Sequence, residues 1–154
     1  MTKSEVLQLY NNLNQLGKLS GVKFSYAVAR NLALLKPEVE AINKTLEPSK
    51  EFLEWDKERV ALAQEYSKKD EKDKPIVEGN RYVMENEKTF NKELEKKQKN
   101  HKSAIDAREK QIEEYMKLLE EKTDEIKLYK IKLEHIPESI TTQQMNGIVD
   151  IVEE

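Results

Sequence analysis

Apolar residues recur at helical intervals along most of the chain, and this spacing predicts a mainly helical fold. Thr2-Lys3-Ser4-Glu5 fits a capping box, which should start a first amphipathic helix that ends near residues 17–21. Apolar residues on one face of residues 24–35 predict a second helix, so residues 1–35 are expected to form the N-terminal helices. Pro37 predicts a kink, or the end of one helix and the start of another.

Residues 38–122 have the pattern of a long antiparallel helical hairpin that is interrupted by a small β element. In its first arm, four apolar residues stand seven apart, as in a coiled-coil seam: Val39, Leu46, Leu53 and Val60. The second arm, residues 87–122, has no Gly or Pro and a thin seam that includes Ile112, and it would span roughly 50 Å as one helix. Gly79-Asn80 separates two short runs of β-forming residues and predicts a β-hairpin near residues 75–84.

Residues 126–154 are expected to form a strand and a C-terminal helix. Alternation over residues 131–134 indicates the strand, which should join the hairpin to give about three short strands. Thr141 and Gln144 fit a second capping box, which should start a last helix with Ile148 and Val152 on its apolar face. Residues 1–154 are thus predicted to form a single domain. Its outline is similar only in topology to prefoldin subunits, which place a β-hairpin between two coiled-coil helices.

The composition is that of a helical protein with a thin core. Of the 154 residues, 37% are charged and 37% hydrophobic, with only 4 Gly and 4 Pro, which is typical of long amphipathic helices. The formal net charge is -3 without a concentration of Lys and Arg, which argues against nucleic-acid binding. The N-terminus lacks the apolar stretch of a signal peptide, and no segment resembles a membrane span, so we expect a cytoplasmic protein that has no membrane partner.

Residues with catalytic or metal-binding chemistry are few and scattered. The chain has no Cys, which excludes disulfides, thiolate nucleophiles and Cys-based zinc sites. Neither His101 nor His135 has a second ligand one helical turn away, so no metal site is expected. Carboxylate pairs such as Glu109 and Glu113 lie on charge-dense helix faces, where ion pairing is the expected state. We therefore expect no catalytic residue, cofactor or small-molecule substrate, and an enzyme is the third hypothesis.

One stripe of bulky residues beside the predicted seam indicates protein binding. Its members are Phe52, Trp55, Arg59, Leu62 and Tyr66. Trp, Tyr and Arg dominate the energetics of interfaces, but the stripe also fits an internal contact with the first two helices or the β element, which we favour. His101 and Arg108 occupy seam positions of the second arm and would weaken its own pairing, so either this arm is mobile at that end or another chain, such as a second copy in a homo-oligomer, covers it. The candidate interaction residues are Phe52, Trp55, Arg59, Tyr66, His101 and Arg108.

Three further stretches carry a resemblance to a known group of proteins: Val22 to Asn31, Tyr66 to Tyr82, and Ile131 to Ile148. They resemble small helical proteins, without an agreed activity, that are encoded by phages and prophages of Gram-positive bacteria. The resemblance spans most of the chain and implies a phage origin. Such accessory proteins commonly build the particle or disable a host protein. The leading hypothesis is therefore a non-enzymatic module that binds and inhibits or sequesters a bacterial protein, such as an anti-phage defence component. The alternative is a particle-assembly factor or a prefoldin-like chaperone or scaffold.

Overall fold

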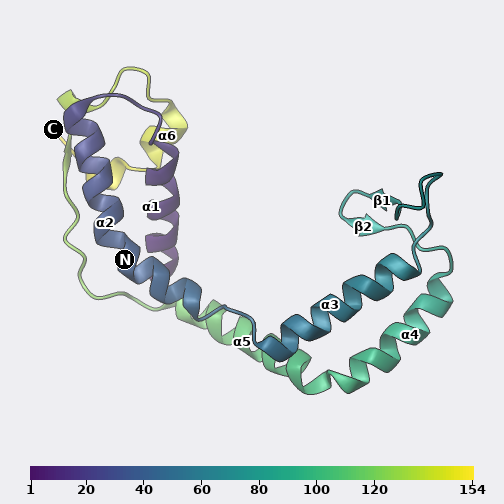
Figure 1. Cartoon of the computed structure of the whole chain (residues 1–154). Helices are drawn as coiled ribbons and strands as arrows, with labels where there is room; N and C mark the ends of the chain where they lie inside the picture. Colours follow the sequence, from purple (N-terminus) through teal and green to yellow (C-terminus); the bar gives the residue numbers. More distant parts are fainter. The chain divides into compact units, whose positions relative to one another are not determined.

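Figure 1 shows a computed structural model of the protein, which describes residues 1–154. The fold is mainly helical, as predicted, and it contains two small two-stranded sheets where the sequence predicted one β element of about three strands. The helices are α1 (Lys3–Gln15), α2 (Val22–Lys44), α3 (Lys50–Glu65), α4 (Glu87–Asn100), α5 (Lys102–Glu120) and α6 (Thr142–Asn146). The strands are β1 (Val77–Glu78), β2 (Arg81–Tyr82), β3 (Ile131–Lys132) and β4 (Val152–Glu153).

The chain divides into two compact units. Unit 1 comprises Met1–Leu46 and Glu114–Glu154, and unit 2 comprises Glu47–Glu113. Unit 1 therefore holds α1, α2, α6 and the β3–β4 sheet, while unit 2 holds α3, α4 and the β1–β2 hairpin. Helix α5 begins in unit 2 and ends in unit 1. Both boundaries fall within residues 38–122, which the sequence pattern groups as one segment.

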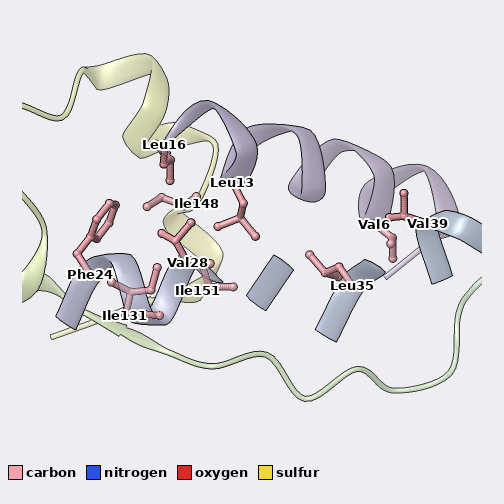
Figure 2. Packing of buried hydrophobic residues seen from close by; sticks show 11 residues of the cluster. Val6, Leu13, Leu16, Phe24, Val28, Leu35, Val39, Ile131, Ile148 and Ile151 are labelled. Atoms are coloured by element: carbon pink, nitrogen blue, oxygen red, sulfur yellow. The ribbon is translucent and has the colours of Figure 1, made fainter. Parts of the chain in front are cut away.

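The core of unit 1 lies between α1 and α2, whose apolar side chains point toward one another in Figure 2. Helix α1 buries Val6 and Leu13, seven residues apart, as expected for a helix with one apolar face. Three isoleucines from the C-terminal part of the chain complete the cluster: Ile131, Ile148 and Ile151. Because each buried side chain of this size contributes about 1.5–3 kcal/mol, the C-terminal segments are an integral part of this core.

Both predicted capping boxes are present. Thr2 Oγ1 accepts a hydrogen bond from the Glu5 amide at 3.2 Å, and the Glu5 carboxylate accepts one from the Thr2 amide at 2.8 Å. Thr141 and Gln144 form the same reciprocal pair at the start of α6. These bonds satisfy amide groups that have no partner within the helix.

Pro37 does not end a helix, because α2 runs through it to Lys44. Its neighbours Leu35 and Val39 are both buried in the core of unit 1. Their burial outweighs the single helical hydrogen bond that proline removes. The interruption between helices lies instead near Pro48, after the end of α2. There Ser49 Oγ accepts a hydrogen bond from the Phe52 amide and caps the start of α3.

The predicted third strand is present, but the expectation that it joins the hairpin is wrong. Strand β3 pairs in parallel with β4, and the β1–β2 hairpin stays two-stranded. The predicted C-terminal helix is also shorter than expected, because α6 ends at Asn146 and Val152 lies in β4. Burial explains both differences, since Ile131 and Ile151 are 1% and 2% exposed in the core of unit 1. This core brings the two β-forming segments together.

Gly147 caps α6 and is in contact with Asn12 of α1. The Asn12 Nδ2 atom donates a hydrogen bond to the Gly147 carbonyl at 3.0 Å. A Cβ atom at position 147 would stand only 2.9 Å from Asn12 Cγ, which is closer than side-chain packing allows. The absence of a side chain at this position therefore permits the contact between α1 and the C-terminal segment.

A buried asparagine on α2 holds the extended segment that follows α5. Asn31 is 0% exposed; its Nδ2 donates to the Tyr129 carbonyl at 2.8 Å, and its Oδ1 accepts from the Tyr129 amide at 2.7 Å. The Asn31 side chain thus satisfies both backbone groups of Tyr129, as hydrogen bonds from a neighbouring β-strand would. Ile126 and Leu128, at alternate positions of the same segment, pack against the core.

In unit 2, α3 contacts α4 and the start of α5. The contacting pairs run in opposite order along the two segments, as between antiparallel helices: Tyr66 with Phe90, Glu58 with Lys97, and Trp55 with His101. The predicted single helix over residues 87–122 is interrupted at His101, which caps α4. Leu53 and Ile112, which the spacing placed in the seam, are 44% and 43% exposed. The apolar face that α3 buries is formed by Trp55, Leu62 and Ala63.

The β1–β2 hairpin has the predicted two-residue connection. Val77 pairs with Tyr82 and Glu78 with Arg81, which leaves Gly79 and Asn80 as the loop. Gly79 has a φ of 60°, the positive value that the first central residue of a type II′ turn requires. Tyr82 Oη accepts a hydrogen bond from Gln64 Nε2 at 3.0 Å, so the hairpin is tied to the end of α3.

Replacing the buried asparagine should destabilise unit 1. Asn31→Leu removes both hydrogen bonds to Tyr129 and leaves the backbone amide and carbonyl of Tyr129 without a partner. The free energy of unfolding should therefore fall by about 2–3 kcal/mol. Urea denaturation followed by circular dichroism measures this loss, and hydrogen exchange should show faster exchange of the Tyr129 amide. Asn43→Leu, at an exposed position of α2, is the matched control. Equal stability of the two variants would contradict the role assigned to Asn31.

Candidate functional site

All six candidate interaction residues lie in unit 2, on α3 and its C-cap, on α5 and at the α4–α5 junction. Trp55 is 4% exposed, and its ring lies against the ring of His101, with centroids 5.5 Å apart. Trp55 is therefore an internal contact of unit 2. Its partner is the α4–α5 junction, whereas the sequence pointed to the first two helices or the β element.

A small charge cluster surrounds this aromatic pair. Glu58 receives a hydrogen bond from Lys97 Nζ at 3.1 Å, and His101 Nε2 stands 3.4 Å from its other oxygen. The Lys97 hydrogen bond lowers the pKa of Glu58, and His101 adds to this effect. Glu58 thus links α3 to both α4 and the junction at His101. His101 has a structural role here as a ring that covers Trp55 and a partner of a carboxylate.

Phe52 and Arg108 form a second contact between α3 and α5. The Arg108 guanidinium lies 5.6 Å from the centre of the Phe52 ring, a cation–π geometry. Arg108 also donates to Gln111 Oε1 at 2.7 Å, and Gln111 Nε2 donates to the Glu47 carbonyl at 2.9 Å. Arg108 is therefore held in place within unit 2. Its partly exposed guanidinium and the half-buried Phe52 ring are still at the surface.

Arg59 and Tyr66 lie toward the end of α3 that adjoins the hairpin. Arg59 is exposed and donates to Asp56 Oδ1 at 2.7 Å, whereas the Tyr66 ring packs 6.4 Å from that of Phe90. An open groove of about 560 Å³, here called the hairpin groove, lies between α3, the hairpin and α4. Its lining residues are Arg59, Val60, Ala63, Asn80, Arg81, Tyr82, Met84, Glu87, Phe90 and Asn91.

The hairpin groove brings together one predicted residue and several that the sequence did not single out. Arg59, Arg81, Tyr82 and Phe90 all line it, so two guanidinium groups and two aromatic rings border one hollow. These residue types combine large contact area with a polar group, which is why they are enriched at the energetic centres of protein interfaces. Arg81 and Tyr82 directly follow the Gly79-Asn80 turn, and that turn signal was the means to find them.

Unit 1 carries a second hollow, here called the tyrosine groove, of about 570 Å³ beside the start of α2. Its lining residues are Val22, Lys23, Tyr26, Ala27, Tyr129, Lys130, Ile131, Lys132, His135 and Glu153. The Tyr26 and Tyr129 rings meet edge to face, with centroids 5.9 Å apart. Arg30 Nη1 donates to Tyr26 Oη at 3.1 Å, and the guanidinium lies 5.6 Å from the Tyr129 ring centre. Neither tyrosine is among the six candidate interaction residues.

The structure contains no group of three or more His, Asp and Glu side chains placed to hold a metal ion. No helix combines the length and the apolar character that a transmembrane segment needs. Comparison with known proteins finds no match to the chain among protein-family models, curated proteins or solved structures.

Removing the Lys97 ammonium should raise the pKa of Glu58. The hydrogen bond favours the ionised carboxylate, so the pair stabilises the fold above the ordinary carboxyl pKa, and this stabilisation is lost as the pH falls through the lowered value. In Lys97→Met, the Glu58 pKa should return toward its ordinary value, as measured by carbon-13 NMR titration of the side-chain carboxyl. Lys96→Met is the control, because Lys96 lowers the pKa of Glu93 instead. An unchanged Glu58 pKa in Lys97→Met would refute this assignment.

Proposed function

We propose that this protein is a non-enzymatic binding module of phage origin that binds and inhibits or sequesters a bacterial protein. The observation that supports this proposal is the hairpin groove, in which Arg59, Arg81, Tyr82 and Phe90 surround one hollow of unit 2. Side chains of these types bury large area against a partner and direct hydrogen bonds at the same time. We infer that the hairpin groove is the primary recognition surface for the bacterial protein.

The helices of unit 2 supply further surface for a partner. Neither α4 nor α5 contains a fully buried residue, although both are long. Leu53 on α3 and Ile112 on α5 are almost half exposed. Helices that bury so little in their own fold are stabilised when another protein covers their apolar positions. We propose that the helical hairpin formed by α3 and α4–α5 acts as a semi-rigid support that presents these positions together with the hairpin groove.

The phage resemblance of residues 22–31, 66–82 and 131–148 supports a partner from the bacterial host. An accessory phage protein that binds a host protein acts by occupying a surface and needs no reactive group. We propose an anti-phage defence component as the target. The site of action is then the bacterial cytoplasm.

Reversing one charge in the hairpin groove should abolish partner binding without unfolding the protein. Arg81 is exposed on β2, so Arg81→Glu should keep the helical circular dichroism signal and weaken partner retention at least about tenfold, as loss of a central interface arginine does. The measurement is affinity capture from bacterial lysate with quantitative mass spectrometry, followed by titration of the purified partner. Lys57→Glu makes the same charge change on an exposed position of α3 outside this groove. Equal loss of partner binding in the two variants would contradict the proposal, as would unchanged binding in both.

A particle-assembly factor or prefoldin-like chaperone is the second candidate. The element order α3-β1-β2-α4 favours it, since a two-stranded hairpin between two helices is the outline of a prefoldin subunit. A chaperone of this kind holds an unfolded client by apolar contacts. It should therefore suppress the aggregation of a heated client enzyme, measured by light scattering, and Leu53→Asp should reduce this suppression because Leu53 is exposed. Full aggregation in the presence of excess wild-type protein would eliminate this candidate.

A further inference from the structure

The tyrosine groove of unit 1 has a pre-organised aromatic wall. Both rings are accessible, with Tyr26 54% and Tyr129 43% exposed, yet each is held in place. The Tyr129 backbone is fixed by the buried Asn31 side chain, and Arg30 contacts both rings. Exposed side chains that are already ordered lose little conformational entropy when a partner binds them. This wall is therefore suited to recognition.

The charges that line the same groove are predominantly positive. Three lysines face one acidic residue, Glu153, in a chain whose net charge is -3. Lys130 donates to the Asp150 carbonyl, whereas the ammonium groups of Lys23 and Lys132 make no hydrogen bond or salt bridge, although Lys132 stands opposite Glu153 in the β3–β4 pairing. A local excess of unpaired ammonium groups on an acidic protein attracts negatively charged ligands.

The start of α2 adds to this positive potential. Its N-cap is Gly21, which offers no side-chain hydrogen bond, and its first turn holds no acidic residue. The unpaired amide groups and the positive end of the helix dipole therefore point to the region of Val22 and Lys23. His135 also lines this groove, and its Nε2 atom lies 3.2 Å from the nearest carboxylate oxygen of Glu134.

The groove also has an apolar component. Val22 is 90% exposed at its edge, and the tyrosine rings form one wall. A volume of about 570 Å³ accommodates a few residues of an extended chain. A ligand that matches the groove therefore combines carboxylates with at least one apolar or aromatic side chain.

We propose that the tyrosine groove binds a short acidic peptide segment of a partner protein. Carboxylates of the segment pair with Lys23 and Lys132, and an apolar side chain packs against Val22 and Tyr26. A peptide fits better than a nucleic acid, because the basic lining is short and the surrounding chain is acidic overall, whereas nucleic-acid binding depends on many phosphate contacts. This groove lies in a different unit from the hairpin groove, so the inference does not depend on the function proposed above.

The probe for this proposal is a fluorescein-labelled peptide of alternating Glu and Leu with a central Tyr, titrated with the full chain by fluorescence anisotropy. Binding should weaken at least about tenfold in Lys23→Glu and in Lys132→Glu, since each change replaces an attraction by a repulsion. Tyr26→Ala should also weaken it. A peptide with Gln in place of every Glu should bind correspondingly weakly, and added salt should reduce the affinity for the acidic probe.

Two control variants make the result specific. Lys57→Glu alters the net charge equally, and Arg81→Glu disables the hairpin groove, so both should bind the acidic peptide like the wild type. Equal weakening by Lys57→Glu and Lys23→Glu would overturn the proposal, as would the absence of binding to the wild type at millimolar concentration. Tighter binding of a single-stranded oligonucleotide than of the peptide, with the same sensitivity to Lys23→Glu and Lys132→Glu, would assign the groove to nucleic acid instead.

Discussion

The pair of hydrogen bonds between Asn31 and Tyr129 is the constraint on which unit 1 depends. A polar side chain buried on a helix is costly unless both its donor and its acceptor are satisfied, and only one extended backbone position satisfies both here. That position sets the register of the segment after α5. It directs Ile126 and Leu128 to the core and leads into Ile131 in β3. It also orients the Tyr129 ring beside Tyr26, so the same interaction that closes the core shapes the tyrosine groove.

Unit 2 is held together by fewer buried apolar residues than unit 1. Its helices are rich in charge, and few of their apolar residues are enclosed. The single tryptophan therefore has a large share of the packing, and it is covered by His101 at the point where α4 ends and α5 begins. Contacts such as Arg108 on Phe52 and Lys97 with Glu58 are partly exposed pairs, which contribute little each. A unit held in this way keeps much of its surface available to a partner, which is consistent with the proposed binding role.

The two grooves use the same types of side chain in different electrostatic settings. The hairpin groove combines two arginines with Tyr82 and Phe90, and the tyrosine groove combines lysines with Tyr26 and Tyr129. Arginine forms planar, directional hydrogen bonds, whereas the lysine ammonium acts more nearly as a point charge. We therefore expect the first groove to select a folded surface by shape and the second to select a segment by charge.

The sequence by itself determined the helical class, both capping boxes, the Gly79-Asn80 turn and the starts of α1, α4 and α6, because these features depend on residues within a few positions of each other. It was insufficient for the partner of β3, the continuation of α2 through Pro37, and the exposure of Leu53. Each of these depends on which distant surface buries a segment, and a local pattern does not encode that choice. The grooves have the same origin. Tyr26 and Tyr129 are far apart in the chain, and they meet because Asn31 binds the Tyr129 backbone while the apolar side chains of the extended segment pack on the core of unit 1.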